Sequence, residues 1–479
     1  MKTKIKNPFA LPALIVASCL MLAGRAAAQI FTTLHSFTAT NGVAVTNSDG
    51  ATPYAGLILS GNTLYGTAFG GGSAGVGTVF TVHTDGTGFT TLHSFTAISG
   101  PNSTNSDGAN PWAGLVLSGN TLYGTAPSGG RSGYGTVFAV NTDGTGFTTL
   151  HSFTTTPAPS YTNRDGAYPH GGLVLSGSTL YGTASQGGTG GGGTVFAVNT
   201  DGTGFTNLHS FAGYPSDGAS PWARLVLSGN TLYGTAVYGG SRGNGMLFAL
   251  NNDGSGFRNL HSFDGRDGHT PTGFILSGNT LYGTTQNDDI RGFGTVFKVN
   301  TDGTGFTTLH LFGGYPSDGA NPASGLIVSG HTVYGTAGYG GSLGKGMVFA
   351  LNTDGTRITN LHNFTDGSDG GGPIGGLMIS GNTLYGTAYS GGSSGKGTVF
   401  SLSFPRPQLT ISPSGTNVIL SWSANVAGFD YTGYTLQSTT NLGSSAVWAT
   451  NSPGPVVING QNTVTNSISG TQQFFRLIQ

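Results

Sequence analysis

Histidine and aspartate recur along the chain at fixed places, and these residue types could support acid–base or metal chemistry. One histidine lies in each Leu-His-Ser-Phe or close variant, and one aspartate begins each Asp-Gly-x-x-Pro. The histidines are His35, His93, His151, His209, His261, His310 and His362, and the aspartates are Asp49, Asp107, Asp165, Asp217, Asp267, Asp318 and Asp369. Neutral imidazole binds transition metals, but equivalent positions in neighbouring repeats lie too far apart to share one ion. We therefore predict hydrogen-bonded structural histidines, and aspartates that cap backbone N–H groups in turns.

A third series of aspartates lies in Asp-Gly turns: Asp85, Asp143, Asp201, Asp253, Asp302 and Asp354. Oxygen-rich loops of this kind are one way to hold calcium, but an EF-hand loop ends in a bidentate glutamate. All 18 acidic residues of this chain are aspartate, so every mechanism that needs a glutamate is excluded. We predict turns here, no metal ligands and no cofactor, with a calcium ion in each repeat as the alternative.

Residues that break the repeat pattern are better candidates for a single catalytic site. In the fifth repeat the segment 286–291 replaces the usual Gly-Gly loop and brings Asp288 and Asp289, with His269 in the same repeat. We interpret the segment as a solvated polar loop and assign no catalytic residue, but keep both aspartates as candidate binding residues. The enzymatic alternative is an Asp/His-based polysaccharide lyase or hydrolase built on these three side chains.

The residue after the repeated proline is a ring-bearing side chain in the first four repeats only. These residues, here called the aromatic arc, are Tyr54, Trp112, His170 and Trp222, and they are followed by Thr272, Ala323 and Ile374 in the last three repeats. Flat apolar rings fit the C–H faces of pyranose sugars, so we predict that the arc binds carbohydrate. Packing under the neighbouring loops is the alternative explanation.

The elements that must position these side chains are short strands. The tyrosine of Leu-Tyr-Gly-Thr, or once Val-Tyr-Gly-Thr, recurs seven times at spacings of 49 to 58 residues, and each repeat contains four segments rich in β-branched and aromatic residues. In the second repeat these are 89–95, 114–118, 121–126 and 135–141. Four strands per repeat predict an all-β fold, a seven-bladed β-propeller over residues 29–404. A β-helix, which needs shorter parallel repeats, is the alternative.

The ends of the array predict how the propeller closes. The array opens with an outer-type strand at 31–37 and finishes with 397–402, so the first strand is expected to complete the last blade and close the ring. Loop length varies on one face only, because 12 residues separate Phe37 from Asp49 but only 4 to 6 separate the equivalent positions of later repeats. Binding residues tend to lie on such loops, and we place the aromatic arc on this variable-loop face.

These motifs resemble the GloVer-type (Gloeo-Verruco) tandem-repeat family of exported bacterial choice-of-anchor proteins. The resemblance covers about 31–402 and rests on Leu-His-Ser-Phe, Asp-Gly-x-x-Pro, Leu-Tyr-Gly-Thr and Gly-Thr-Val-Phe in this order. It implies export and a varied C-terminal anchor, but no particular reaction. The strand order is also similar to kelch-type propellers.

The C-terminal segment has a different pattern. Pro405 and Pro407 interrupt the strands, so we interpret 405–407 as a linker and 408–479 as a small β-sandwich module with a buried Trp422, similar to fibronectin type III modules. Family members that are anchored end in a hydrophobic helix and a basic tail. This chain ends instead in Phe-Phe-Arg-Leu-Ile-Gln, which departs from that pattern.

The first residues indicate export. Residues 1–28 combine a basic start, an apolar run and Ala26-Ala27-Ala28, and are predicted to be a secretory signal peptide. A lipoprotein site at Cys19, the single cysteine, is the alternative. Cleavage after Ala28 leaves 13 basic against 18 acidic residues, a net charge of −5. A weakly acidic chain without basic clusters is not expected to bind nucleic acid, and no later segment is apolar for long enough to span a membrane.

The sequence therefore predicts an exported protein, secreted or attached to the cell surface, that binds or supports other molecules without catalysis. The expected partner is a polysaccharide or another cell-surface component, recognised on the variable-loop face, and the protein is expected to be a monomer. The alternatives are the lyase or hydrolase described above and a scaffold for protein–protein interaction.

Overall fold

The computed structural model describes residues 29–213, 217–415, 417–426, 428–440, 446–467 and 473–478. Within these ranges every regular element is a β-strand, which confirms the all-β class. The predicted signal peptide, 1–28, lies outside the described residues. In the part of the chain that is described, no helix is long and apolar enough to cross a membrane.

Each repeat folds into one four-stranded antiparallel sheet whose strands follow each other along the chain. The first three sheets are β2 (Ile58–Ser60), β3 (Thr63–Ala68), β4 (Thr78–His83) and β5 (Thr90–Ser94); β6 (Val116–Ser118), β7 (Thr121–Ala126), β8 (Thr136–Asn141) and β9 (Thr148–Ser152); and β10 (Val174–Ser176), β11 (Thr179–Ala184), β12 (Thr194–Asn199) and β13 (Thr206–Ser210).

The later repeats form equivalent sheets. They are β15 (Val226–Ser228), β16 (Thr231–Ala236), β18 (Met246–Asn251) and β19 (Arg258–Ser262); β20 (His269–Ser277), β21 (Thr280–Asn287), β22 (Thr295–Asn300) and β23 (Thr307–Leu311); β25 (Ile327–Ser329), β26 (Thr332–Ala337), β28 (Met347–Asn352) and β29 (Ile358–Asn363); and β30 (Met378–Ser380), β31 (Thr383–Ala388) and β32 (Thr398–Ser403) with β1 (Ile30–Ser36). Two short ribbons lie beside them, β14 (Gly218–Ala219) with β17 (Tyr238–Gly239) and β24 (Gly319–Ala320) with β27 (Tyr339–Gly340).

The repeated motifs explain the strands and turns of each sheet. In the first repeat, a Cβ on Gly66 would lie 2.6 Å from the ring of Phe80, so the glycine of Leu-Tyr-Gly-Thr makes room for the phenylalanine of Gly-Thr-Val-Phe on the next strand. In the turn between β4 and β5, the Oδ1 atom of Asp85 accepts hydrogen bonds from the N–H and hydroxyl of Thr87 at 2.9 and 2.7 Å. Gly86 in that turn has φ 85°, a conformation that favours glycine. The predicted Asp-Gly turn is confirmed.

The first strand belongs to the sheet of the last repeat. β1 pairs with β32 in an antiparallel register of six residue pairs. Phe31 of β1 stacks on His362 with ring centroids 3.9 Å apart, the same contact that Phe89 makes with His35 at 3.6 Å. β1 therefore occupies the outer position of that sheet, as the phase of the repeats predicts.

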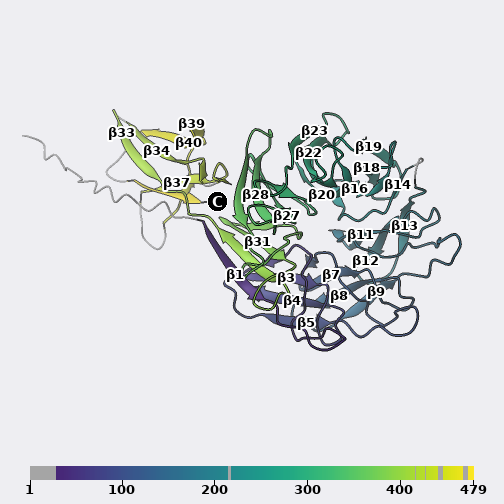
Figure 1. Ribbon diagram of the computed structural model, residues 1–479. Coiled ribbons are helices and arrows are strands. Elements are labelled where there is room, and N and C mark those ends of the chain that lie inside the picture. Colours follow the sequence, from purple (N-terminus) through teal and green to yellow (C-terminus); the bar gives the residue numbers. More distant parts are fainter. Residues whose placement is uncertain are drawn as a thin grey trace, which may run out of the picture.

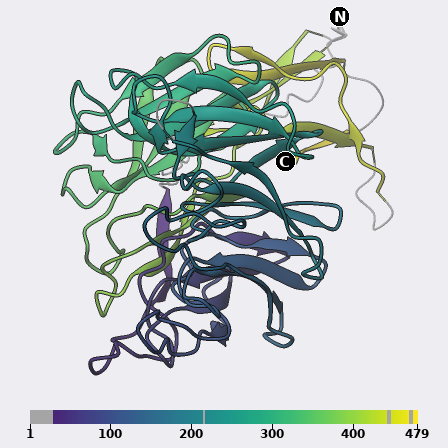
Figure 2. The ribbon, with the colours of Figure 1, turned by 90° about the vertical axis from the view of Figure 1, so that its right-hand side faces the viewer.

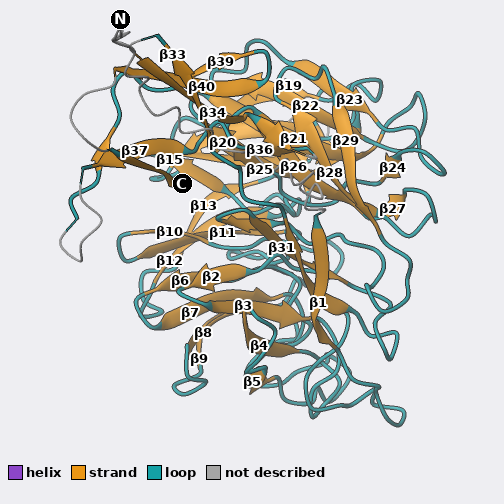
Figure 3. Cartoon of the chain, turned by 90° about the vertical axis from the view of Figure 1, so that its left-hand side faces the viewer, coloured by secondary structure: helices purple, strands orange, loops and turns teal. Residues whose placement is uncertain are grey.

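Adjacent sheets pack face to face and bury a hydrophobic core between them. One such core joins Tyr65 and Val79 of the first sheet to Leu115, Leu122 and Phe138 of the second. The inner strand β20 contacts the inner strands β15 and β25 on either side. The repeat sheets are thus arranged in succession around a common centre, a propeller-like architecture (Figures 1 and 3).

The C-terminal segment forms three further small sheets. One contains β33 (Thr410–Ser414), β34 (Asn417–Ser423), β40 (Gln461–Ser467) and β39 (Val456–Ile458); the second contains β38 (Ala449–Thr450), β37 (Thr435–Thr439) and β41 (Phe474–Ile478); and the third contains β35 (Asn425–Val426) and β36 (Phe429–Asp430). Trp422 is 1% exposed, which confirms its predicted burial. These strands are here called the C-terminal module.

The C-terminal module packs against the last two repeats (Figures 1 and 2). Phe404, just after β32, contacts Phe429 with ring centroids 4.5 Å apart. The backbone N–H of Asp430 donates to the hydroxyl of Tyr334 at 2.9 Å, and the Asp430 carboxylate accepts from the N–H of His331 at 2.6 Å. His331 lies in the tight turn between β25 and β26, so the module covers the face of the repeats that carries the tight turns.

Candidate functional site

The recurring histidines and aspartates form one pair in every repeat, which the sequence analysis did not foresee. The Nε2 atom of each histidine lies 2.6 to 3.1 Å from the Oδ2 atom of the aspartate that follows it in the chain. The partners are 14 residues apart in the first three repeats and 6 to 8 apart in the others. The loop length changes, but the pair is retained.

Each pair is packed as a structural unit. The ring of His93 stacks on Phe147 of the next repeat with centroids 3.7 Å apart. Burial raises the pKa of Asp107, but hydrogen bonds from His93 and Thr96 outweigh this effect and lower it below the ordinary value. The prediction of packed, hydrogen-bonded histidines is confirmed. Among the described residues, no group of three or more His, Cys, Asp or Glu side chains could hold a metal ion.

In the first three repeats the aspartates of Asp-Gly-x-x-Pro act at a different place from the one predicted. Asp49 accepts from the backbone N–H of Thr38 at 3.0 Å, eleven residues earlier, and so caps the start of the variable loop. The local turn is held instead by Asn47, whose Oδ1 accepts from Gly50 N–H at 3.0 Å and from Gly72 N–H at 2.8 Å. In the first three repeats the local cap is thus the asparagine two residues before the aspartate, whereas in the sixth repeat Asp318 itself accepts from Gly319 N–H at 2.8 Å, as predicted.

The candidate residues of the fifth repeat lie close together but have different environments. Asp288 is 3% exposed, and its carboxylate accepts hydrogen bonds from four backbone N–H groups of residues 290–294 at 2.6 to 3.0 Å. Burial raises its pKa, but these hydrogen bonds outweigh burial and lower it. Asp289 is open to solvent, and its Oδ1 lies 3.8 Å from Nε2 of His269. Asp288 therefore organises the loop.

The structure brings the four residues of the aromatic arc into one row. Tyr54 and Trp112 stack with centroids 4.2 Å apart and 29° between the ring planes, and His170 and Trp222 stack at 5.1 Å and 23°. Between these two pairs, Trp112 meets His170 edge to face at 6.4 Å. Trp222 is 43% exposed, and the other three side chains are half-buried.

His170 takes part in the row as a neutral ring. Its Nδ1 atom lies 3.0 Å from the carbonyl oxygen of Tyr168 and 3.1 Å from Oγ of Ser185. Burial lowers the pKa of His170 below its ordinary value, against the smaller opposing effect of the hydrogen bond to Tyr168. Near neutral pH this imidazole therefore adds a flat, uncharged surface beside Trp222.

Two tyrosines that the sequence analysis missed extend the row beyond Tyr54. The ring centroid of Tyr389 lies 5.4 Å from that of Tyr54, and its hydroxyl is 3.4 Å from that of Tyr339. Both come from the loop after Leu-Tyr-Gly-Thr rather than from the position after proline. Because only the proline position was compared between repeats, the second source of rings on the same face was overlooked.

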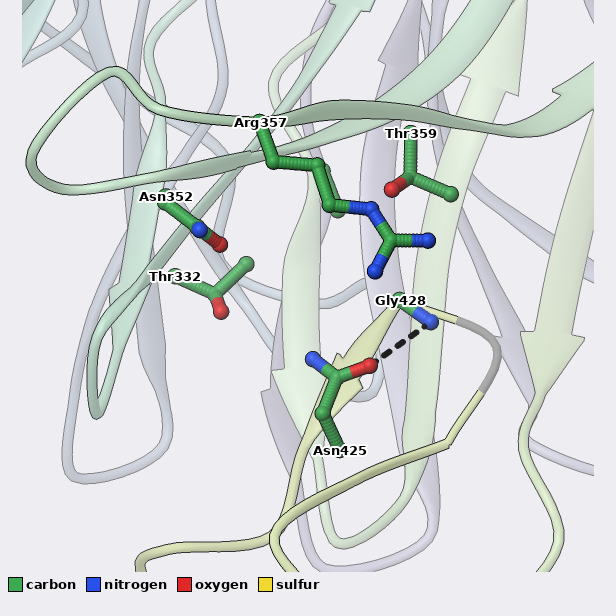
Figure 4. Close-up of a pocket in the computed structure, with 7 residues that line it drawn as sticks. Thr332, Asn352, Arg357, Thr359, Asn425 and Gly428 are labelled. Carbon is green, nitrogen blue, oxygen red and sulfur yellow. Dashed lines mark hydrogen bonds between the residues drawn. The ribbon is translucent and has the colours of Figure 1, made fainter. Parts of the chain in front are cut away.

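The chain direction places the arc on the face opposite the C-terminal module. The arc residues lie just before the inner strands, whereas the tight turns that contact the module lie at the other ends of these strands. At that opposite face a cavity of about 150 Å³ separates the sixth repeat from the module, lined by Asn352, Arg357, Thr359, Asn425 and others. Figure 4 shows Arg357 extending over it toward Gly428.

A larger groove lies on the variable-loop face at the outer strands. It has a volume of about 680 Å³ and is lined by the loop residues Ser99 and Asn105 together with Arg131, His151 and others. Its lining is mainly polar, and its histidine belongs to one of the repeated His–Asp pairs. The groove contains no ring of the aromatic arc.

Comparison with solved structures finds distant similarity. The chain is similar to an oligogalacturonate lyase from Vibrio parahaemolyticus (11% identity, 79% of this chain, 98% of that chain, TM-score 0.49). It is also similar to a puromycin hydrolase mutant (14% identity, 81% of this chain, 61% of that chain, TM-score 0.47). A third similar structure is the computationally designed protein Ika8 (14% identity, 79% of this chain, 96% of that chain, TM-score 0.42).

Comparison at the sequence level identifies the repeats. No curated protein matches the chain. The Gloeobacter/Verrucomicrobia repeat matches it three times in succession, at residues 25–161, 155–278 and 273–450. These matches cover most of the chain, including every Leu-His-Ser-Phe and Leu-Tyr-Gly-Thr motif described above. The chain therefore belongs to the Gloeobacter/Verrucomicrobia repeat family.

Proposed function

We propose that this protein is an exported, non-catalytic binding protein that recognises a polysaccharide or cell-surface glycan through the aromatic arc. The observation that carries the proposal is the continuous row from Tyr54 to Trp222, in which four repeats contribute one ring each. Partly open rings on a rigid scaffold offer apolar surface to the C–H faces of sugars at low cost in conformational entropy. The face that carries them is not covered by the C-terminal module.

The Trp222 end of the arc is the most favourable place for a sugar ring. In the described residues, His170 is the one ring that stacks on Trp222. The next two repeats carry Thr272 and Ala323 at the equivalent position, and these small side chains leave space beside the second face of the indole. By contrast, Tyr54 and Trp112 cover one face of each other and are less exposed.

The scaffold that supports this site is, in our proposal, a closed seven-bladed β-propeller of residues 29–404. The pairing of β1 with β32 and the stacking of Phe31 on His362 support closure, because they give the last sheet the outer strand that every other sheet has. A closed ring has no long exposed strand edges. It also holds the rings of distant repeats at fixed separations.

The C-terminal module completes the proposal. We assign it to retention of the protein at the cell surface after export, because it covers the tight-turn face and leaves the aromatic arc uncovered. A module of small antiparallel sheets with a buried Trp422 is compatible with a fibronectin type III-like fold. The charge of −5 that the sequence leaves on the exported chain agrees with a partner other than nucleic acid.

The test is glycan retention by purified chain 29–479 on a polysaccharide array, with reducing-sugar release measured in the same wells. Trp222→Ala is expected to weaken retention roughly tenfold, equivalent to about 1.4 kcal/mol. Trp448→Ala is the matched control, because it removes a tryptophan that contacts Arg476 in the C-terminal module. Equal retention by both variants, or no retention by the wild type, contradicts glycan binding by the arc. Release of reducing sugar contradicts the non-catalytic assignment.

A further inference from the structure

One position near the aromatic arc carries an arginine where most repeats carry glycine. Three residues after the repeated proline the chain has glycine in five repeats: Gly56, Gly114, Gly172, Gly325 and Gly376. A Cβ on Gly56 would lie 2.7 Å from the carbonyl oxygen of Gly376, and one on Gly114 would lie 3.0 Å from that of Gly56. The glycines therefore allow neighbouring inner segments to approach closely. The fourth repeat has Arg224 at this position, and the fifth has Phe274.

Trp222 and Arg224 are both open to solvent, although they are separated by one buried residue. Exposure alternates along the segment, because Trp222 and Arg224 are open whereas Ala223 and Leu225 are buried. The chain bends at Ala223, and Cα atoms two residues apart are at most about 7 Å apart. The arginine thus belongs to the same exposed part of the segment as the indole.

Contacts with the third repeat fix the direction of the arginine. Its Nε donates to the carbonyl oxygen of Leu173 at 2.9 Å. Its Cγ and Cδ atoms pass 3.6 and 3.5 Å from the place where a Cβ of Gly172 would be. Because Gly172 lacks a side chain, the arginine extends across it toward Leu173. Gly172 and Leu173 directly follow the segment that carries His170, so Arg224 reaches the same neighbouring repeat that Trp222 contacts through His170.

Arg224 has no counter-charge in the part of the chain that the structure describes. Among these residues, its one hydrogen bond is the Nε contact and no carboxylate pairs with it. Burial lowers the pKa of Arg224, although the residue remains partly exposed to solvent. A cation that has lost part of its hydration is costly without a counter-charge, and such a site favours an anionic ligand.

We propose that Arg224 binds the carboxylate of a uronic acid whose pyranose ring stacks on Trp222, so that the glycan recognised is acidic. This inference depends on the proposed function, and it specifies the class of sugar. With Nε engaged by Leu173, the two terminal nitrogens Nη1 and Nη2 are available, and their planar arrangement matches the two oxygens of a carboxylate. The Cα atoms of Trp222 and Arg224 are at most about 7 Å apart, a distance that one sugar unit can span.

The experiment compares an acidic polymer with its uncharged derivative. Chain 29–479 is titrated with alginate, with propylene glycol alginate, in which the carboxylates are esterified, and with carrageenan, which carries sulfate esters. The wild type is expected to bind alginate at least tenfold more tightly than the ester. Arg224→Gln and Arg224→Gly should remove this difference without changing the affinity for the ester. Arg224→Gly restores the residue found in five other repeats and so preserves the fold.

A control variant and the remaining outcomes separate this inference from the proposed function. Arg242→Gln removes an exposed arginine of the same repeat and should leave the preference for alginate unchanged. Equal affinity for alginate and its ester, with both weakened by Trp222→Ala, overturns the role of Arg224 but supports the aromatic arc. A preference for carrageenan that depends on Arg224 overturns the assignment to a carboxylate. Absence of binding to all three polymers overturns both proposals.

Discussion

Closure of the propeller can be tested with a pair of equivalent phenylalanines. Phe37 follows β1 and Phe95 follows β5, and both side chains are 0% exposed. Phe37 packs edge to face on Phe80 at 5.4 Å, and Phe95 packs in the same way on Phe138 at 5.3 Å. Phe37 belongs to the proposed junction between the last and first blades, whereas Phe95 belongs to an internal junction. If the ring is closed, alanine at either position should have the same effect.

The expected magnitude follows from burial. Replacing a fully buried phenylalanine with alanine costs about 3–5 kcal/mol in the free energy of unfolding. At about 2.1 cal/mol/K of unfolding entropy per residue, a propeller of residues 29–404 unfolds with an entropy of about 0.8 kcal/mol/K. Phe37→Ala and Phe95→Ala should therefore each lower Tm by about 4–6 °C. Deletion of 29–38 should lower it further, because the β1–β32 pairing is also lost.

Differential scanning calorimetry of the wild type and of both variants measures this effect, with circular dichroism confirming that each variant folds at 20 °C. The closed ring predicts equal losses within about 1 kcal/mol for the two variants. A loss below about 1 kcal/mol for Phe37→Ala, with the full loss for Phe95→Ala, would refute the reasoning, because the first strand would then contribute little to the scaffold.

Two further predictions concern acid stability and the C-terminal module. Since the pKa of Asp107 is below its ordinary value of 3.8, the stability that its hydrogen bonds contribute is complete above that value and is lost as pH falls below it. Between pH 4 and pH 2 the Tm of Asp107→Asn should therefore fall less than that of the wild type, and equal falls would argue against this contribution. Tyr334→Phe should cost about 1–3 kcal/mol and speed proteolytic cleavage near 405–407, because the N–H of Asp430 loses its partner. Tyr282→Phe, at the same position of the fifth repeat, should do neither.

Much of the fold was predictable because the same motifs recur in every repeat and form equivalent strands. The Leu-Tyr-Gly-Thr motif predicts a strand, and it forms β3, β7 and their equivalents, all of which begin two residues before the tyrosine. All of them end three residues after it except β21, which continues to Asn287. The phase of the ends also predicted the pairing of β1 with β32. Local composition was sufficient for the strands within a repeat, because these pair with their neighbours in the chain, whereas the β1–β32 pairing followed from the order of the motifs at the two ends.

Contacts between separate motifs were harder to predict. Each His–Asp pair joins two repeated motifs, Leu-His-Ser-Phe and Asp-Gly-x-x-Pro. The number of residues between the histidine and the aspartate changes from 14 to 6 along the chain, so neither motif alone indicates the pairing. The packing of Tyr334 against the C-terminal module could not be predicted from its motif, because Val-Tyr-Gly-Thr differs from the six Leu-Tyr-Gly-Thr copies only in one aliphatic residue. In the structure it is 0% exposed, against 6% to 9% for the equivalents such as Tyr233 and Tyr282.

At the candidate site, comparison between repeats was informative where it was complete. The position after proline revealed the aromatic arc, and the structure joins all four residues. The position two residues later was not compared, and Arg224 was missed for that reason. Asp288 was a candidate because no other repeat has an aspartate at its position. In the structure its carboxylate accepts hydrogen bonds from backbone N–H groups of its own loop, so a residue that departs from the repeat pattern can also stabilise a loop.

The departures of the sixth repeat show how the module and the arc come to lie on opposite faces. Where other repeats have Gly-Phe two residues after the Asp-Gly turn, this repeat has Arg357-Ile358. Ile358 therefore replaces the ring that would stack on His310, and Arg357 lines the cavity beside Gly428. The tight-turn face of this repeat thus differs from that of the other repeats where it lies beside the module. Trp222 and Arg224 lie before the inner strand β15, at the end opposite its tight turn. The hydrogen-bond partner of Arg224 is a backbone carbonyl oxygen, that of Leu173. The residue that departs from the pattern at the tight-turn face, Arg357, lies against the C-terminal module. Those at the opposite face, Trp222 and Arg224, remain exposed to solvent, which is the arrangement expected of a surface that binds a separate molecule.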